Sequence, residues 1–210
     1  MTEQNRIQWV YSSTSEDELA QRYDVWAKDY DSDLNRDFAW LGPKSAVDVF
    51  VKYVTNKQGF ILDAGVGTGQ VGELLAELGY KNLEGMDLSN GMLAEARKKK
   101  IYRQLRLLRL GGPLCYPDDA FDAVISVGVM TVGHAPASSL DELVRATKPG
   151  GYVVYTLRPD LHQTGGFKEK HAELEAAGKW KLAEVTDPIQ FLPKGEPEIT
   201  HQIWAFEVTS

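Results

Sequence analysis

Short apolar runs alternate with helical patterns along most of the chain, and this alternation constrains the fold more than any other feature. The apolar runs occupy residues 59–65, 82–87, 105–110, 121–130 and 151–158. The helical patterns lie at 15–34, from Pro43 onward, and at 70–80, 89–100, 139–148 and 167–179. Strands that alternate with helices pair in parallel, because the helix returns the chain to the same end of the sheet. We therefore expect an α/β fold with a doubly wound parallel sheet and helices on both faces.

Two capping boxes mark where helices should begin. In each box a Ser is followed three residues later by a Glu, and each side chain can satisfy a backbone N–H near the other. The pairs are Ser15 with Glu18, and Ser139 with Glu142. We expect the first pair to open a helix that runs to about Leu34. The second should open a helix that stops before Pro149.

The last two expected strands lack a helix between them. They occupy residues 181–192 and 201–210, and only the short segment PKGEPEI joins them. Such a short link suits an antiparallel pair of strands. We therefore expect the otherwise parallel sheet to carry an antiparallel pair at one edge.

Composition narrows the class of protein. The 210 residues suffice for one domain, and 43% hydrophobic with 25% charged residues is typical of a soluble globular protein. No run approaches the roughly 18 apolar residues of a membrane span, and the first ten residues do not resemble a signal peptide. The single cysteine, Cys115, excludes an internal disulfide. These features favour a cytoplasmic protein.

The net charge of −7 argues against nucleic acid as a partner, because binding it requires a concentrated basic surface. One segment differs: residues 97–109 contain seven of the 23 Lys and Arg residues. A solvated helix end followed by an amphipathic strand accounts for this run. A patch for nucleic acid or an acidic partner is the alternative.

The segment ILDAGVGTGQVGE at residues 61–73 carries the strongest functional signal. It fits G-x-G-x-x-G, which binds a pyrophosphate, and also D-x-G-x-G-x-G. Glycine is needed where a Cβ would meet a ligand or where φ is positive. Asp63 is poorly placed beside an anionic pyrophosphate and suits a ligand with an ammonium group. Asp87, at the end of the second strand, can accept hydrogen bonds from ribose hydroxyls of either ligand.

Five segments together resemble the class I S-adenosylmethionine-dependent methyltransferases. The glycine loop matches their first motif, Asp87 their ribose-binding acid, and DLSNGMLAEAR the pattern that follows this acid. FDAVIS and KPGG match their fourth strand and the turn before the fifth. Within this class, YDVWAKDYD, LGGPL, SVGVMTVGHAP and TKPGG resemble the methyltransferase-like proteins of the Williams–Beuren syndrome region. The resemblance covers about residues 23–158.

The resemblance implies a fold and a domain organisation. The sheet would be Rossmann-like, with seven strands in the order 3-2-1-4-5-7-6 and the last strand antiparallel. One methyltransferase domain would span residues 1–210, and S-adenosylmethionine would be its cofactor. Within the domain, 1–42 would form an N-terminal helical lid, 43–158 the cofactor-binding core, and 159–210 a C-terminal helix and strand pair.

The resemblance also implies cofactor-binding residues. Those of the glycine loop, on the methionine and ribose side, would be Asp63, Ala64, Gly65, Gly67 and Gly69. Those near the ribose and adenine would be Asp87, Leu88, Met92, Leu110 and Gly111. Those near the sulfonium and methionine end would be Val127, Trp26 and Tyr30. An acidic residue often stands where this chain has Leu110 and Gly111, so the adenine amine would meet a backbone carbonyl or water instead.

Two further residues follow strands at the edge where this class binds its substrate. A neutral His134 could take a proton from the acceptor. Arg158 could bind an anionic substrate, although a surface ion pair is the alternative. His162, His171 and His201 show no metal-ligand spacing, so we expect no metal and place these side chains toward solvent.

Methyl transfer from S-adenosylmethionine to a small-molecule acceptor by in-line displacement is the leading hypothesis. It requires no covalent catalytic residue, and the sequence names none. The alternatives are a nicotinamide-dependent oxidoreductase, a non-catalytic S-adenosylmethionine-binding protein and a nucleic-acid-modifying enzyme. Asp63 and the missing Tyr/Lys arrangement argue against the oxidoreductase. The acceptor and the oligomeric state are left open.

Overall fold

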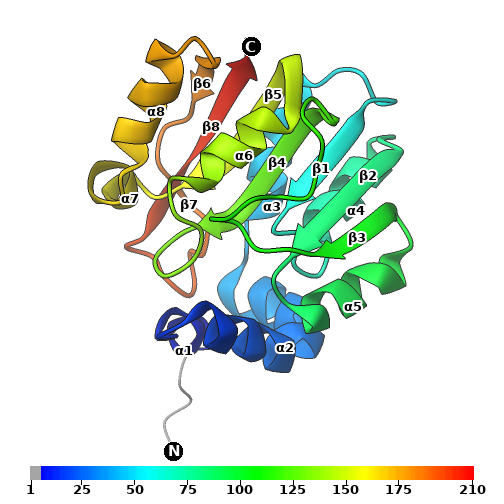
Figure 1. Ribbon diagram of the computed structural model, residues 1–210. Helices are drawn as coiled ribbons and strands as arrows, with labels where there is room; N and C mark the ends of the chain where they lie inside the picture. Colours follow the sequence, from blue (N-terminus) through cyan, green and yellow to red (C-terminus); the bar gives the residue numbers. More distant parts are fainter. Residues whose placement is uncertain (1–5) are drawn as a thin grey trace, which may run out of the picture.

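One twisted sheet runs through the computed structural model, which describes residues 6–210. The first five residues, part of the expected lid segment 1–42, lie outside this range. The strands are β1 (Phe60–Ala64), β2 (Asn82–Asp87), β3 (Tyr102–Leu107), β4 (Phe121–Met130), β5 (Thr147–Leu157), β6 (Trp180–Val185), β7 (Ile189–Gln190) and β8 (Thr200–Val208). Their order is β3-β2-β1-β4-β5-β8-β6, and the short β7 pairs with β8 (Figure 1).

The strand directions confirm the expected fold class. β1, β2, β3, β4 and β5 pair in parallel, whereas β8 is antiparallel to both β5 and β6. With β7 set aside, β8 takes the place of the seventh strand, so the expected order 3-2-1-4-5-7-6 is confirmed. The carboxyl ends of the five parallel strands therefore meet at one edge of the sheet, where α/β sheets bind ligands.

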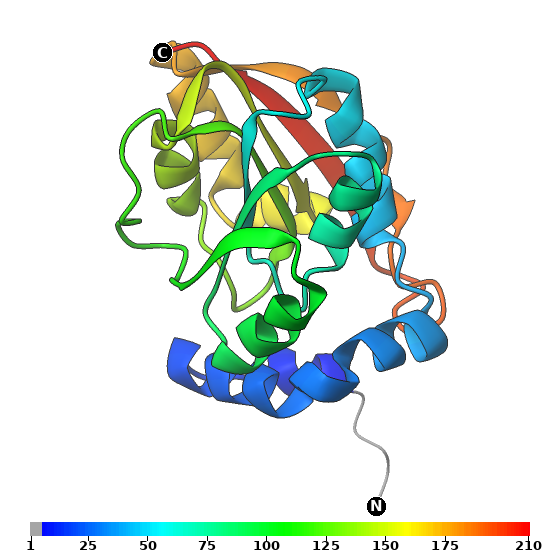
Figure 2. The same cartoon turned by 90° about the vertical axis from the view of Figure 1, so that its right-hand side faces the viewer.

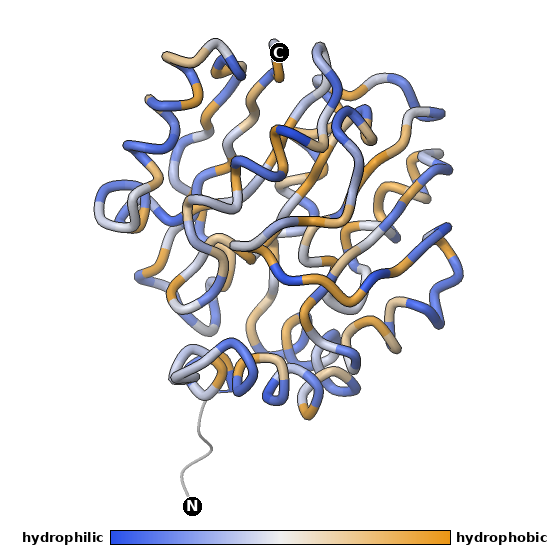
Figure 3. Tube along the Cα trace, in the orientation of Figure 1, coloured by the Kyte–Doolittle hydropathy of each residue, from blue (hydrophilic) through white to orange (hydrophobic). Residues whose placement is uncertain are grey.

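Helices cover both faces of the sheet. α3 (Gly42–Tyr53) and α4 (Gln70–Glu77) pack on one face, and α6 (Ser139–Arg145) and α8 (Phe167–Ala176) on the other (Figure 1). Residues of β4 alternate between the two cores: Ile125 packs with α3, whereas Val124 packs with α6. A strand buried on both sides needs a nearly continuous apolar sequence. Figure 3 accordingly shows apolar residues along the central strands and polar ones along the outer helices.

A separate helical layer crosses the carboxyl ends of the parallel strands. It consists of α1 (Arg6–Tyr11), α2 (Glu16–Asp33) and a π-helix, η1 (Leu34–Phe38), and both views place it below the sheet (Figures 1 and 2). The Ser15 hydroxyl caps α2 by accepting from the N–H of Glu18 at 3.2 Å. The Glu18 carboxylate returns to the N–H of Thr14, at 2.8 Å, one residue before the expected partner.

The second expected capping box is wrong. Ser138, not Ser139, precedes α6, and no side chain caps this helix. The Ser139 hydroxyl is buried and has no partner among the described residues. Glu142 instead pairs with Arg145 at 2.8 Å and accepts from the N–H of Leu114 at 2.6 Å. The carboxylate therefore holds a distant loop, a contact that a local pattern does not reveal.

Some element boundaries also differ from the expected ones. β3 begins at Tyr102 instead of residue 105, and β5 begins at Thr147, so KPGG lies inside the strand. α1 and α7 (Pro159–Thr164) were not expected, since six residues are too few for a clear period. α5 (Asn90–Lys99) begins where predicted, with Ser89 as its cap. None of the helices in residues 6–210 is long and apolar enough to cross a membrane.

Candidate functional site

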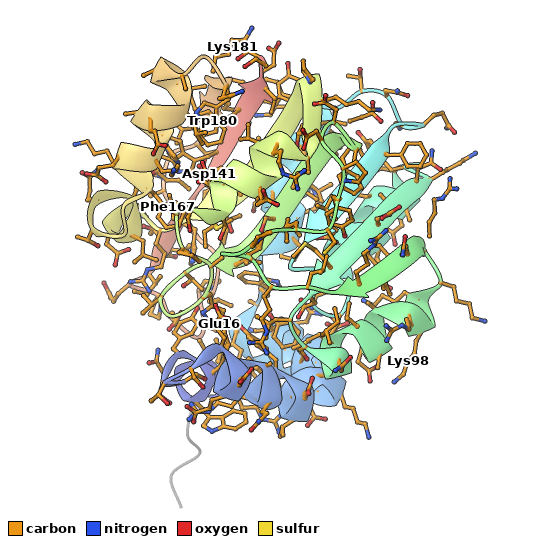
Figure 4. The ribbon with its side chains drawn as sticks, in the orientation of Figure 1. Glu16, Lys98, Asp141, Phe167, Trp180 and Lys181 are labelled. Carbon is orange, nitrogen blue, oxygen red and sulfur yellow. The ribbon has the colours of Figure 1, made fainter. Side chains whose placement is uncertain are left out.

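A cavity lies between α2 and the carboxyl ends of β1, β2 and β4. Its lining residues are Glu16, Leu19, Tyr23, Tyr30, Gly65, Gly67, Met86, Asp87, Leu88, Met92, Leu108, Arg109, Leu110, Val127, Gly128, Val129, His134 and Ala135. Figure 4 labels Glu16 on the first turn of α2, between this helix and the sheet. The cavity thus occupies the ligand-binding edge of the sheet, roofed by the N-terminal layer.

The glycine loop forms one wall of this cavity. Gly65 has a φ of +82°, and a Cβ on it would meet Val129 at 2.2 Å. Gly67 has a φ of +54°, but a Cβ there would meet no atom within 4 Å, since it would enter the cavity. Gly69, with a φ of +93°, leads into α4. The loop therefore needs glycine for its backbone shape, and at Gly67 it also leaves space for a ligand.

Asp87 closes β2 and lies at the cavity with 9% of its surface exposed. One carboxylate oxygen accepts from the N–H of Gly67 at 2.8 Å, and the other accepts from the N–H of Ser89 at 2.9 Å. Burial raises the pKa of Asp87 to about 6, although the backbone N–H groups that it binds oppose the shift. Each oxygen has a further lone pair, so the ionised carboxylate can accept additional hydrogen bonds from a ligand.

Asp63 lies behind the glycine loop and is not part of the cavity lining. Its side chain is 1% exposed, and the Tyr102 hydroxyl donates to Oδ2 at 2.7 Å. The other oxygen, Oδ1, is buried with no hydrogen-bond partner in the described part of the chain. Burial raises the pKa of Asp63 to about 7. The cavity therefore has a buried, incompletely paired acid next to it.

Tyr23 and His134 form a hydrogen-bonded pair at the cavity. The Tyr23 hydroxyl and Nε2 of His134 are 2.8 Å apart, and Nδ1 of His134 is 2.8 Å from the carbonyl oxygen of Val132. Because a carbonyl only accepts, Nδ1 carries the hydrogen and Nε2 accepts from Tyr23. Burial lowers the pKa of His134, which keeps the ring neutral near pH 7. The neutral imidazole can therefore take up at Nε2 a proton that Tyr23 passes to it.

Polar contacts tie α2 to the core around the cavity. Asp24 accepts from the Ser89 hydroxyl at 2.6 Å and from the N–H of Gly91 at 2.7 Å. Arg109 pairs with Glu16 and Asp17 on the first turn of α2. These contacts hold α2 against the core. A change of charge at Asp24 or Arg109 would weaken them.

The structure brings nine of the residues expected from the sequence together around the cavity. They are Tyr30, Gly65, Gly67, Asp87, Leu88, Met92, Leu110, Val127 and His134. Those outside its lining are Trp26, Asp63, Ala64, Gly69, Gly111 and Arg158. Trp26 lines an adjoining space. Arg158 pairs with Asp160 at 2.7 Å and lines a separate groove.

Sequence reasoning did not name several residues of the lining. They are Glu16, Leu19, Met86, Leu108, Arg109, Gly128, Val129 and Ala135. Gly128 carried a signal, because a glycine within the apolar strand β4 indicates a close approach or an unusual backbone, and its φ is +74°. Glu16 and Arg109 carried none, since their approach depends on how α2 docks.

Two of the histidines expected to face solvent are buried. His171 is 8% exposed and His201 is 5% exposed. Burial lowers the pKa of His171 to about 3 and that of His201 to about 4, so both rings are neutral. The described residues contain no group of three or more His, Cys, Asp or Glu that could hold a metal ion.

Comparisons with known proteins agree on one family. A family model described as a methyltransferase domain matches residues 62–155. Human methyltransferase-like protein 27 is 37% identical over 173 residues, which cover 78% of this chain and 70% of that protein. This similarity and the fold confirm the family predicted from the sequence motifs.

Solved structures show the same fold at low sequence identity. The magnesium protoporphyrin IX methyltransferase of Synechocystis, solved with bound S-adenosylmethionine, has a TM-score of 0.58 at 16% identity. The alignment covers 98% of this chain and 90% of that one. The cyclase SpnF has a TM-score of 0.70 at 16% identity, over 94% of this chain and 98% of that one. Together with the curated relative, they show that this chain belongs to the class I S-adenosylmethionine-dependent methyltransferases.

Proposed function

We propose that this methyltransferase acts on a small-molecule acceptor by in-line displacement, with S-adenosylmethionine in the cavity roofed by α2. The observation that carries the proposal is the pairing of Gly67 with Asp87. Open space lies beside Gly67, and the buried carboxylate of Asp87 adjoins it. A ribose placed there could donate its hydroxyls to Asp87 without meeting a side chain on the loop.

The remaining lining residues fit the other parts of the cofactor. Leu88, Met92 and Leu110 provide an apolar surface suited to the adenine ring. Val127 and Gly128 lie in the last four residues of β4 and line the same cavity as Tyr30. The buried Asp63 carboxylate would attract the ammonium group of the methionine part, because a charge acts over several ångströms in a region of low dielectric constant. We propose these roles residue by residue.

The protein has to position the acceptor and exclude water. S-adenosylmethionine supplies an electrophilic methyl group when it is bound. The half-buried rings of Tyr23 and Tyr30 close the cavity on the side of α2 and restrict where an acceptor can lie. Alignment of the reacting atoms at about 3–3.5 Å supplies much of the rate enhancement in such reactions. This mechanism needs no covalent intermediate with the enzyme.

The Tyr23–His134 pair can receive the proton that the acceptor loses. In the proposed step, the Tyr23 oxygen takes the proton of the acceptor while its own proton passes to Nε2 of His134. The acceptor gains a methyl group and loses a proton, and His134 ends as an imidazolium. The low pKa of His134 favours return of this proton to solvent afterwards.

Acceptor-dependent turnover tests the proposed function. Purified protein is incubated with S-adenosylmethionine and a panel of uncharged phenols, amines and thiols, and S-adenosylhomocysteine is quantified by mass spectrometry. We expect formation that depends on one class of acceptor and that falls in Tyr23→Phe. Binding of the cofactor without turnover of any acceptor would indicate a binding protein instead. Turnover only with RNA or DNA would contradict a small-molecule acceptor.

The basic segment 97–109 gives little support to nucleic acid as the acceptor. Several of its cations already have partners: Lys98 with Glu95, Lys99 with Asp31 and Glu73, and Arg109 with Glu16 and Asp17. Arg106 lies over the ring of Tyr116, 4.9 Å from its centroid. Cations that pair within the protein contribute less to binding phosphates. We therefore retain a small molecule as the proposed acceptor.

A further inference from the structure

A second chamber adjoins the proposed cofactor cavity, between the N-terminal layer and the ends of β4 and β8. Its walls include five aromatic side chains: Tyr11, Tyr23, Trp26, Tyr30 and Trp40. The rings come from α1, α2 and the segment before α3. Aliphatic residues of α1 and η1, together with Met130 and Leu192, fill most of the remaining wall. The chamber is therefore lined mainly by ring faces and apolar groups.

The chamber and the cofactor cavity share part of their walls. Tyr23, Tyr30 and Gly128 line both spaces. Gly128 has a φ of +74°, and a Cβ there would lie 3.4 Å from the Trp40 ring. Glycine thus suits the backbone and leaves this boundary free of a side chain. A molecule in the chamber would be next to the end of β4, where the proposed methyl transfer takes place.

Two polar side chains of the chamber are buried without a complete set of partners. Nδ1 of His201, on β8, has no hydrogen-bond partner in the part of the chain that the structure describes. Thr131 Oγ1 likewise has no partner that meets hydrogen-bond geometry, although it lies near enough to Tyr11 to influence the pKa of that residue. Most buried polar groups are paired, so two such atoms in one apolar chamber call for an explanation.

The neutral ring of His201 forms one side of the chamber. Its ring stacks on Phe191, with centroids 4.8 Å apart and planes inclined by 4°. Burial lowers its pKa to about 4, assisted by the charge of Arg158 and opposed by that of Asp160. In this state Nδ1 can donate or accept one hydrogen bond, according to the tautomer.

The chamber offers no charged partner to a ligand. None of the described residues that line it is Lys, Arg, Asp or Glu. The indole N–H of Trp26 already donates to Asp33 at 2.8 Å, which leaves the ring face for packing. Burying an anionic ligand here would be unfavourable, because Arg158, whose charge acts on His201, already pairs with Asp160 and does not line the chamber.

We propose that this chamber is the acceptor site and that the acceptor is an uncharged molecule with an aromatic ring and a hydroxyl or similar polar group. The space between the side chains is about 40 Å³, smaller than a single ring, so the ring would pack among Trp26, Tyr30 and Trp40 once the N-terminal layer moves outward. The polar group would be one other than the methylated atom, and it would bond to Nδ1 of His201 and to the Thr131 hydroxyl beside Tyr11. This inference rests on the proposed function, because the chamber is placed relative to the cofactor cavity.

Binding of three matched single-ring probes tests the inference. Phenol, toluene and benzoate are titrated into the full chain saturated with S-adenosylhomocysteine, and binding is followed by calorimetry and by the total tryptophan fluorescence, to which Trp26 and Trp40 contribute. We expect phenol to bind about tenfold more tightly than toluene, since it alone supplies a hydrogen-bonding group. We expect no measurable binding of benzoate.

Two substitutions remove the polar groups with little change in shape. Thr131→Val and His201→Phe should each reduce the affinity for phenol until it approaches that for toluene. Neither variant should change the affinity for toluene. Thr131→Ser, which keeps the hydroxyl, should retain the preference for phenol even if Thr131→Val folds poorly. Thr55→Val alters an exposed threonine outside the chamber and serves as the matched control.

Three results would overturn the inference: equal affinity for phenol and toluene, tighter binding of benzoate, or unchanged phenol binding in both variants. Separate calorimetry with S-adenosylhomocysteine alone distinguishes this failure from failure of the proposed function. If S-adenosylhomocysteine binds but phenol does not, only the chamber assignment fails. If S-adenosylhomocysteine does not bind, the proposed cofactor site itself is wrong.

Discussion

The carboxylate of Asp87 accepts a hydrogen bond from the backbone N–H of Gly67 at 2.8 Å, which joins the end of β2 to the glycine loop after β1. The same carboxylate accepts from the N–H of Ser89 at the start of α5. Two segments with separate sequence signals are therefore parts of one structural unit. A change in the acid should affect both the ligand that it binds and the loop that it holds.

We expect Asp87→Ala to weaken S-adenosylhomocysteine binding by at least about 100-fold. Two charge-assisted hydrogen bonds to the ribose would be lost, each contributing roughly 1.5–3 kcal/mol. Isothermal titration calorimetry measures the loss. Asp48→Ala removes an exposed acid paired with Lys44 and should leave the affinity unchanged. Unaltered binding by Asp87→Ala would remove this residue from the site.

Gly67→Val should abolish cofactor binding while the protein stays folded. The branched side chain would enter the open space beside the loop, and the positive φ adds strain of roughly 1–3 kcal/mol. Gly178→Val is a matched control, because Gly178 has a φ of +65° and nothing within 4 Å of an added Cβ. Circular dichroism and calorimetry should show similar folding but loss of binding only at Gly67. Equal affinity of the two variants would contradict a ligand beside the loop.

The buried Asp63 should make the ligand-free protein less stable as the pH rises. Its folded-state pKa of about 7 exceeds the unfolded value near 3.9, so the folded protein binds this proton more tightly. The proton on Asp63 therefore adds up to about 4 kcal/mol to the free energy of unfolding below about pH 4. This addition is lost as the pH rises through 7.

Asp63→Asn should remove this dependence. Urea unfolding at pH 5 and pH 8 gives the free energy of unfolding for the wild type and the variant. We expect the variant to gain stability relative to the wild type at pH 8, and this gain to be smaller at pH 5. A difference between the two proteins that does not vary with pH would show that Asp63 keeps an ordinary pKa.

The N-terminal layer should act as a lid that closes over the cofactor. Arg109 holds the first turn of α2 through Glu16 and Asp17, and Asp24 holds its middle. Hydrogen exchange of residues 15–40 should slow when S-adenosylhomocysteine binds. Arg109→Gln should speed exchange in the first turn and shorten the lifetime of the complex. Identical exchange with and without the ligand would contradict closure of the lid.

The fold was largely predictable because its signals are local. The apolar runs indicated the strands, although β3 is only partly buried and begins earlier than its run, and the helical periods between the runs required parallel pairing. The link between β6 and β8 indicated the antiparallel edge in the same way. Short elements such as α1 and α7 gave no comparable signal, since six residues cover fewer than two helical turns.

The site was predictable only where chemistry and sequence position coincide. Gly67 follows β1 and Asp87 ends β2, so their places at the carboxyl edge could be inferred from the chain alone. The hydrogen bond between Tyr23 and His134 joins residues 111 positions apart and depends on how α2 docks. The burial of His201 depends in the same way on the packing of β8 against Phe191. Such contacts are tertiary, and periodicity does not encode them.

The central claim is that an adenosyl amino acid, and not a dinucleotide, occupies the cavity. Thermal shift and calorimetry with S-adenosylhomocysteine, 5′-methylthioadenosine and NAD test it most directly. At about 100 times its dissociation constant, a ligand adds roughly 2.7 kcal/mol of stability. We expect S-adenosylhomocysteine to bind most tightly, 5′-methylthioadenosine more weakly because it lacks the ammonium group, and NAD not measurably. Asp63→Asn should reduce the difference in affinity between S-adenosylhomocysteine and 5′-methylthioadenosine. Stabilisation by NAD without any by S-adenosylhomocysteine would contradict the account.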